Sequence, residues 1–414
     1  MYLLPFFFTL LLSTFSLAAE AKIELGIDRL FSDPYAKLLQ GKKIGLITNQ
    51  TGVNRSLETT MQLFIQHQKR YGYELKAFFA PEHGIFGESY AEESIATIKS
   101  VGGIPIYSLH GETRRPTKEM LKAISLLVFD IQDIGSRTYT FASTLFYVME
   151  EAAKQHIPVL VLDRPNPING IVIDGPMLEK EFRSFIGYVN VPYCHGMTIG
   201  ELARLFNEQY AIKCDLHIVP MKGWKRSMSF EETGLTWIPT SPNIPEASTV
   251  CFYPITGPVG EIAPVSIGIG YTLPFKVIGA PWIQADLFAS ALNQYQLPGV
   301  IFHPTRFKPF AGRFAKKSCQ GVLITITDRQ RFLPVTTQYA ILSALKALYP
   351  KQMNEGIKAF EEKQNNFFKS CGTQEIFKIL KTKKTAFEEL KTIHSKERAE
   401  FLVTRKKFIL SDYQ

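Results

Sequence analysis

Short apolar runs alternate with amphipathic stretches from residue 43 onwards. Each run is apolar at consecutive positions, which is typical of strands buried on both faces of a parallel sheet. The stretches between the runs repeat apolar residues at helical spacing. The predicted strands cover residues 43–48, 75–80, 126–130 and 159–163, and the predicted helices cover 57–68, 117–123 and 139–155. We therefore expect an α/β fold that begins with a Rossmann-like domain containing a mostly parallel sheet.

The pattern changes in the second half of the chain. Turn-rich segments at 239–245 and 257–264 precede a mixture of helical and extended patterns. The predicted helices cover 284–296, 338–348 and a region beyond 372, and the predicted strands cover 300–304 and 322–327. We expect a catalytic domain over 22–240 and a smaller α+β domain over 241–414, which completes the cleft.

Residues 1–21 form an apolar run that ends in small residues and is typical of a secretory signal peptide. Cleavage is expected near Ala19 or Ala21. No Lys or Arg precedes the run, so an uncleaved anchor is the alternative, although the run is shorter than the ~20 residues that span a bilayer. No later stretch is apolar enough to span one. The sequence predicts a protein that is exported to the periplasm or secreted, with no stable membrane insertion after cleavage.

Composition, charge and the absence of certain motifs limit which partners and cofactors the protein can bind. Of 414 residues, 45% are hydrophobic and 21% charged, which excludes a disordered chain. Lys and Arg number 47 against 38 Asp and Glu, a balance of +9 that favours an acidic partner such as nucleic acid, a membrane surface or an anionic cell-wall polymer. There is no dinucleotide or P-loop glycine motif, and the five cysteines lack metal-site spacing. We expect no cofactor and no metal; a disulfide between Cys194 and Cys214 or Cys251 stays open.

Polar residues gather where the predicted strands end. In an open α/β sheet the ligand crevice lies outside the carboxyl ends of the strands, so these side chains are the candidate site. His195 lies just before a helix for which Thr198 is the expected N-cap, and a later group lies in turns. The candidate catalytic residues are Glu82, His83, Asp130, Asp133 and His195, and the candidate substrate-binding residues are Asn49, Arg137, Tyr139, Asp163, Arg164, Asn166, Ser241, Asn243 and Glu261.

Each candidate also has a structural alternative. Glu82 could pair with Arg137, and the aspartates after the third strand could accept hydrogen bonds from loop amides. Asp163 and Arg164 could form a structural ion pair.

Seven strings in order make the chain resemble the exo-β-N-acetylmuramidase family of glycoside hydrolases over almost its whole length. They include Pro81-Glu82-His83-Gly84, the run from Asp130 to Tyr139, and Asp163-Arg164-Pro165-Asn166-Pro167. The resemblance implies removal of N-acetylmuramic acid from the non-reducing ends of peptidoglycan fragments, with Glu82 as the proton donor. It implies muropeptides as partners, MurNAc-GlcNAc among them, and no nucleic acid. The oligomeric state stays open.

The chain also departs from that family. Ile267 and Ile269 stand where the family has charged residues, and Cys194 stands where an arginine is common. A non-catalytic peptidoglycan-binding or muropeptide-binding protein is therefore the alternative function. An esterase or amidase is disfavoured because no GxSxG elbow is present. For the second catalytic role the candidates are His83, Asp130, Asp133 and His195, and the choice between retention and inversion stays open.

Overall fold

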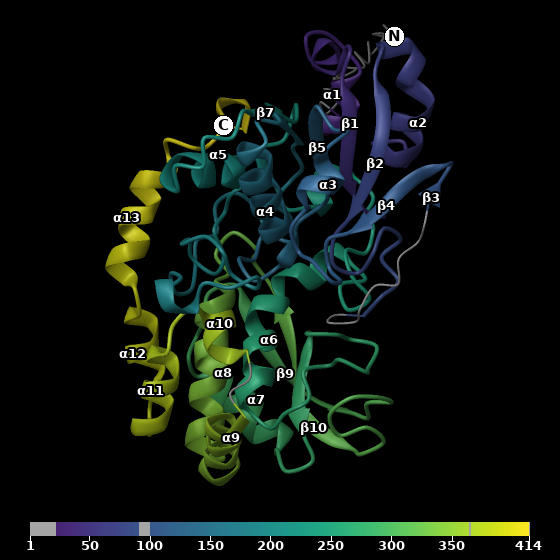
Figure 1. The fold of residues 1–414 in the computed structure, drawn as a ribbon. Helices are drawn as coiled ribbons and strands as arrows, with labels where there is room; N and C mark the ends of the chain where they lie inside the picture. Colours follow the sequence, from purple (N-terminus) through teal and green to yellow (C-terminus); the bar gives the residue numbers. More distant parts are fainter. Residues whose placement is uncertain (1–21, 91–99, 364–365, 414) are drawn as a thin grey trace, which may run out of the picture.

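A seven-stranded sheet forms the first part of the protein (Figure 1). The computed structural model describes residues 22–90, 100–363 and 366–413; the predicted signal peptide lies outside them. In sheet order the strands are β3 (Ser100–Val101), β4 (Ile104–Ser108), β2 (Glu74–Ala80), β1 (Lys43–Thr48), β5 (Leu126–Asp130), β6 (Val159–Leu162) and β7 (Leu216–Val219). All neighbours are parallel except β3 and β4. The prediction of a mostly parallel sheet is confirmed.

Helices cover both faces of this sheet, which is why its strands are apolar at consecutive positions. Leu46 and Val128 face the side covered by α1 (Gly26–Leu30) and α2 (Thr60–Tyr71). Phe129 faces the other side, which α4 (Thr140–Lys154) and α5 (Ile199–Gln209) cover.

Hydroxyl caps set where two of these helices begin. The Thr59 side chain accepts a hydrogen bond from the Gln62 amide and starts α2 three residues later than predicted. Thr198 caps α5 in the same way, as predicted. The cap of α5 fixes the segment that carries His195.

The second part of the chain builds an antiparallel sheet with helices against it, which confirms the predicted α+β character. The strand order is β8 (Val277–Ala280), β10 (Cys319–Ile326), β9 (Val300–Phe307). The remaining helices are α3 (Lys118–Leu121) in the first part and α6 (Tyr253–Ile262), α7 (Ala285–Asn293), α8 (Pro334–Leu348), α9 (Pro350–Lys363), α10 (Phe367–Cys371), α11 (Glu375–Thr382), α12 (Phe387–Thr392) and α13 (Ser395–Arg405). One buried apolar cluster runs from the large sheet into α8 and the small sheet, so the two parts share a core.

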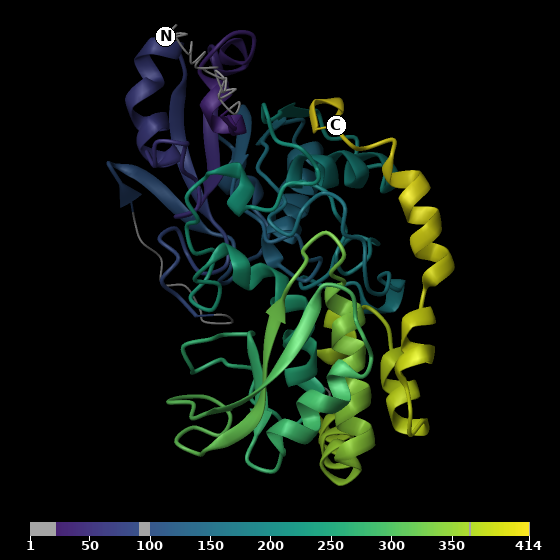
Figure 2. The ribbon, with the colours of Figure 1, turned by 180° about the vertical axis from the view of Figure 1, so that it is seen from behind.

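The C-terminal segment returns to the first part of the protein. Figures 1 and 2 show α11 to α13 passing along one side of the molecule, so that the C-terminus ends beside the large sheet. The Tyr413 hydroxyl donates to Asp163 at 2.6 Å, and Arg405 donates to the carbonyls of Gly170 and Gly196. The carboxyl end of the chain therefore stabilises the strand ends of the first sheet.

The described residues contain neither a membrane-spanning helix nor a disulfide. Within residues 22–90, 100–363 and 366–413, no helix has both the length and the apolar composition needed to cross a membrane. All five cysteines are described, buried and free, so no disulfide joins Cys194 to Cys214 or Cys251.

Candidate active site

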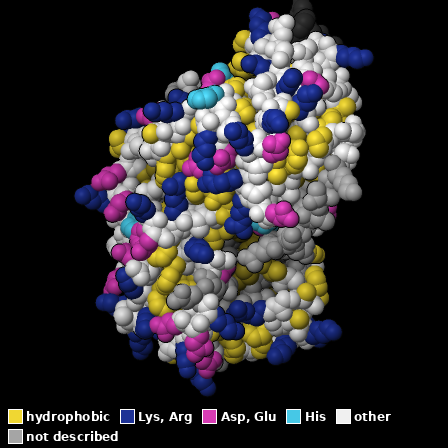
Figure 3. All heavy atoms as spheres, viewed as in Figure 1, with side chains coloured by type: hydrophobic (Ala, Val, Ile, Leu, Met, Phe, Trp, Pro, Cys, Tyr) yellow, Lys and Arg dark blue, Asp and Glu magenta, His cyan; other side chains and the backbone are white. Residues whose placement is uncertain are grey.

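A cavity of about 610 Å³ lies at the carboxyl ends of β2 and β4, between the two parts of the protein. Figure 3 shows the surface hollowed between the upper and lower halves of the molecule. Its volume is in the range of small-ligand sites. Six predicted site residues line it: Glu82, His83, Tyr139, Ser241, Asn243 and Glu261.

Glu82 is held at the end of β2 by a tight turn. His83 and Gly84 both adopt positive φ angles, 70° and 81°, and the Gly84 amide donates to the Pro81 carbonyl. This turn points Glu82 into the cavity wall, where its side chain is 7% exposed. The Thr140 hydroxyl, at the start of α4, donates to Oε2 at 2.5 Å. One carboxylate oxygen is thus fixed by the first turn of a helix.

His110 is the neighbour of Glu82 that sequence reasoning missed. Its Nε2 lies 3.5 Å from Glu82 Oε1, and its ring is 8% exposed. The Leu109 amide donates to the Ala80 carbonyl, so the pairing of β4 with β2 brings His110 beside the turn that holds Glu82. The rule that site residues follow strand ends would have located His110 if β4 had been predicted. The strand was not predicted because Pro105 interrupts its apolar run, which is only partly buried.

His83 has one ring nitrogen committed to the backbone. Its Nδ1 lies 2.8 Å from the Ser89 carbonyl oxygen. A carbonyl can only accept, so Nδ1 carries the proton and Nε2 is the acceptor in the neutral ring. His83 can therefore accept a proton or a hydrogen bond at the cavity surface.

Two tyrosines, Tyr139 and Tyr253, line the cavity. The Tyr139 hydroxyl donates to Thr240 Oγ1 at 2.8 Å, and its ring packs edge-to-face on Tyr253 with centroids 6.1 Å apart. Burial raises the pKa of Tyr253 to about 12, and the negative charges of Glu82 and Glu261 add to the effect. Both phenols are neutral hydrogen-bonding groups at neutral pH, and Tyr253 lies within electrostatic reach of both glutamates.

The second part of the chain supplies the opposite wall. Glu261 is near the end of α6, and Ser241 and Asn243 lie in the turn-rich segment that the sequence singled out. Ile267 and Ile269 also face the cavity, so the two positions that depart from the family pattern are part of its wall. Two carboxylates, Glu82 and Glu261, thus reach one cavity from different domains.

Several further lining residues were not predicted. They are polar or aromatic groups from both parts of the protein: Arg114, Thr138, Thr140, Ser184, Phe185, Tyr253, Asn366, Lys369 and Ser370. No local pattern marks them, because they meet only after the chain has folded.

Asp130 and Arg164 lie outside this cavity and bind each other. Arg164 Nε and Nη2 donate to Oδ1 and Oδ2 of Asp130 at 2.6 and 2.8 Å, and the Thr60 hydroxyl donates to Oδ2. The Asp130 and Arg164 side chains are 0% and 4% exposed. This buried bidentate pair holds the ends of β5 and β6 together, and the placement gives Asp130 a structural role.

Asp163 and His195 are also outside the cavity. Asp163 accepts hydrogen bonds from Thr198, Gly200 and Tyr413, and burial raises its pKa to about 6. His195 accepts a hydrogen bond from the Met197 amide at Nδ1, and burial together with the charge of Arg137 lowers its pKa to about 3. His195 is therefore a neutral structural acceptor at physiological pH.

Arg137 holds backbone carbonyls from three segments and does not line the cavity. It donates to Pro176, Val191, Ser370 and Cys371, the last two in α10. Burial lowers its pKa to about 10.

Asn49 and Asn166 make loop contacts. Asn49 accepts from Thr51, and Asn166 donates to the Met197 carbonyl. These two amides and Arg137 therefore shape the loops behind the cavity.

Asp133 is buried behind the cavity with one oxygen bound to the Gly135 amide. Among the described residues, none donates a hydrogen bond to its Oδ1. Burial raises the pKa of Asp133 to about 7. Of the four candidates for the second catalytic role, only His83 lines the cavity.

No group of three or more His, Cys, Asp and Glu side chains in the described part of the chain is arranged to hold a metal ion. That the protein works without one stays a prediction.

Residues 44–248 match the family model described as exo-beta-N-acetylmuramidase NamZ, N-terminal, and residues 251–410 match its C-terminal counterpart. A curated relative is the peptidoglycan beta-N-acetylmuramidase NamZ of Bacillus subtilis, 40% identical over 394 residues, which are 95% of this chain and 92% of that protein.

Two solved structures are similar to this chain over most of its length. A DUF1343 family protein from Bacteroides fragilis has a TM-score of 0.85 at 38% identity, covering 95% of this chain and 99% of that chain. A second protein of that family from the same organism has a TM-score of 0.66 at 26% identity, with the same coverage.

Proposed function

Because this chain belongs to the exo-β-N-acetylmuramidase NamZ family of glycoside hydrolases, we propose that it removes N-acetylmuramic acid from the non-reducing ends of peptidoglycan fragments. Glu82 is the general acid of this proposal. The observation that carries it is a buried carboxylate, held by Thr140 and His110, in the wall of a cavity large enough for a sugar.

Glycoside hydrolysis needs an acid for the leaving oxygen and a second group on the other face of the sugar. Glu82 supplies the proton. Glu261 and His83 are the proposed second groups, since both line the same cavity. Glu261 is the stronger candidate because it faces the cavity from the opposite domain, where a carboxylate can act on the far side of a bound ring.

Exo action is supported by the walls of the cavity. Loops from the large sheet, the turn at Ser241, the helix α6 and the helix α10 all contribute residues to it. A site enclosed from two domains accepts the end of a glycan more readily than its middle.

One observation favours a second function. Ile267 and Ile269 give the cavity an apolar wall at two positions where the family pattern has charged residues. A protein that binds muropeptides without cleaving them would tolerate this change.

Incubation of the purified protein with a chromogenic β-N-acetylmuramide, beside the corresponding glucosaminide, decides between the two functions. Release of chromophore from the muramide supports the enzyme. Binding of N-acetylmuramic acid by calorimetry without release would support the binder.

We also propose export from the cytoplasm, because residues 1–21 have the composition of a signal peptide and the substrate lies in the cell wall. Cell fractionation with an antibody against the protein tests this. Full-length protein retained in the cytoplasmic fraction would contradict it.

A further inference from the structure

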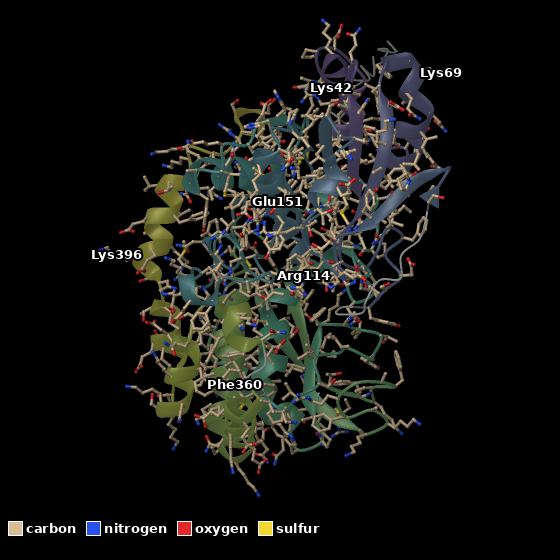
Figure 4. The ribbon with its side chains drawn as sticks, viewed as in Figure 1. Lys42, Lys69, Arg114, Glu151, Phe360 and Lys396 are labelled. Atoms are coloured by element: carbon tan, nitrogen blue, oxygen red, sulfur yellow. The ribbon has the colours of Figure 1, made fainter. Side chains whose placement is uncertain are left out.

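Two cations line the cavity, one from each part of the protein. Arg114 follows β4 in the first part, and Lys369 lies in α10 of the second. Figure 4 shows Arg114 between the two domains. Both side chains are exposed, and neither forms an ion pair with any described residue. Among the described residues, therefore, no ion pair neutralises either of these two charges.

Arg114 is held in place by stacking. Its guanidinium carbon lies 4.3 Å from the centre of the Phe185 ring, which is buried. That ring is 5.7 Å from the ring of His110, the neighbour of Glu82. Stacking on an aromatic face fixes the plane of the guanidinium and leaves its N–H groups at the edge. Arg114 thus presents N–H donors that no described residue accepts, two side chains away from the proposed acid.

The adjacent arginine shows the contrast. Arg115 donates to Glu150, Glu151 and Tyr188, so its donors are used within the protein. Arg114 makes no hydrogen bond of this kind among the described residues. A guanidinium fork with unused donors in a ligand cavity matches a carboxylate.

Apart from Lys369, none of the other residues considered for binding a carboxylate has unused N–H donors in the cavity. Arg137 donates its hydrogen bonds to backbone carbonyls, and Arg164 donates to Asp130. Ile267 and Ile269 carry no charge. The cationic part of the wall is limited, among described residues, to Arg114 and Lys369, with the two histidines beside Glu82.

We propose that Arg114 binds the lactyl carboxylate of the terminal sugar, with Lys369 adding a second positive charge from the facing wall. This assignment rests on the proposed function and adds the residue that selects an acidic sugar. Arg114 dominates because its guanidinium is pre-oriented by Phe185, whereas the Lys369 ammonium is an unstacked point charge.

The test compares two substrates that differ in one charge. These are a chromogenic β-N-acetylmuramide with a free lactyl carboxylate and its lactyl methyl ester. Arg114→Ala is expected to lower kcat/KM at least about tenfold for the free acid and to change it little for the ester, because a charge-assisted contact is lost only with the acid. Lys369→Ala is expected to act in the same direction with a smaller effect.

Matched controls come from elsewhere on the surface. Arg70 also stacks on an aromatic ring, Tyr71, but lies on α2, and Lys378 is an exposed lysine on α11. Arg70→Ala and Lys378→Ala are expected to leave both substrates unchanged. Equal losses on acid and ester in Arg114→Ala, no loss on either, or a larger effect in Lys369→Ala would overturn the assignment.

Binding measurements separate this assignment from the proposed function. Calorimetry with N-acetylmuramic acid and its methyl ester needs no turnover. If the wild type cleaves neither chromogenic substrate, cleavage fails as the function, while selective loss of acid binding in Arg114→Ala still supports the carboxylate site. A muramyl peptide tests which carboxylate Arg114 recognises, because its lactyl carboxyl group is part of an amide bond and carries no charge. Arg114-dependent binding of that peptide equal to that of the free sugar would place the recognised carboxylate elsewhere and overturn the lactyl assignment.

Discussion

Glu82 and Asp130 are both buried carboxylates at strand ends, yet their surroundings give them different roles. Glu82 faces a cavity, with a hydroxyl on one oxygen and a histidine beside the other. Asp130 has both oxygens bound by Arg164. The strand-end rule locates both residues in the sequence. It cannot distinguish them, because the direction of each side chain depends on loops that come from other parts of the chain.

Glu82→Gln is expected to keep the fold and to lower cleavage of the muramide at least about a hundredfold, the usual contribution of a general acid. The amide preserves the shape and can still accept from Thr140, but it has no proton to give. Steady-state rates measure the loss, with Glu112→Gln on the exposed surface as the control. Turnover of Glu82→Gln at the wild-type rate would remove Glu82 from the mechanism.

Asp130→Ala is expected to destabilise the protein by about 3–5 kcal/mol, because it leaves the Arg164 charge buried without its partner. Urea unfolding followed by circular dichroism measures the change. Protein that stays folded at low temperature should retain most of its turnover, since Asp130 does not line the cavity. A variant with wild-type stability and abolished activity would instead return Asp130 to the catalytic candidates.

Activity is expected to survive removal of divalent metals. The acid, the candidate second group and the candidate carboxylate site are all protein side chains in this cavity. Assays after dialysis against a chelator, with and without added Zn²⁺ or Mg²⁺, measure this. Loss of activity that a single ion restores would contradict the prediction.

At the scale of elements, the central strands of the large sheet were predictable and the outer strands were not. Strands β1 and β5 begin and end where the apolar runs predicted, because helices cover both of their faces. Strands β4 and β7 are only partly buried and carry Pro105 and His217, so their patterns are weak. Missing β4 meant missing His110 and Arg114, which follow it. The missed site residues His110 and Arg114 thus follow from a missed outer strand.

The loop after β5 gives a prediction about pH. Burial raises the pKa of Asp133 from 3.8 to about 7, and no cation lies among the causes of its shift. Because the folded state holds this proton more tightly than the unfolded state, stability falls as pH rises between about 4 and 7.

Asp133→Asn removes that titration, and the amide oxygen can still accept from Gly135. The wild type is expected to lose more stability than Asp133→Asn between about pH 4.5 and pH 7.5, measured as urea midpoints. Asp412→Asn, at an exposed carboxylate, serves as the control. Parallel pH profiles for wild type and Asp133→Asn would refute the assignment.

At the scale of the whole molecule, the cavity depends on contacts between distant segments. Arg137, in the loop before α4, binds the carbonyls of Ser370 and Cys371 and so fixes α10, which carries Lys369. No local pattern predicts such a contact, because its partners are more than two hundred residues apart in the chain. Sequence reasoning therefore recovered the two domain types and six of the residues that line the cavity, and missed how one domain closes on the other.

The contacts of Tyr413, near the C-terminus, with the first domain provide a test of these long-range interactions. Tyr413 is fully buried, its hydroxyl donates to Asp163 and accepts from the Met221 amide, and its ring lies 5.1 Å from Trp224. Tyr413→Phe keeps the ring and is expected to cost about 1–3 kcal/mol, because buried hydrogen-bonding groups lose a partner. Tyr413→Ala also empties the ring site and is expected to cost about 3–5 kcal/mol.

Thermal unfolding and chemical denaturation measure these costs, and muramide turnover at low temperature should stay near the wild-type value in Tyr413→Phe. Turnover should be unaffected because Asp163, the partner of Tyr413, lies outside the cavity. The C-terminal segment therefore stabilises the strand ends without contacting the substrate. If Tyr413→Phe kept full stability but lost turnover, the Asp163 network would belong to the chemistry and not to the scaffold.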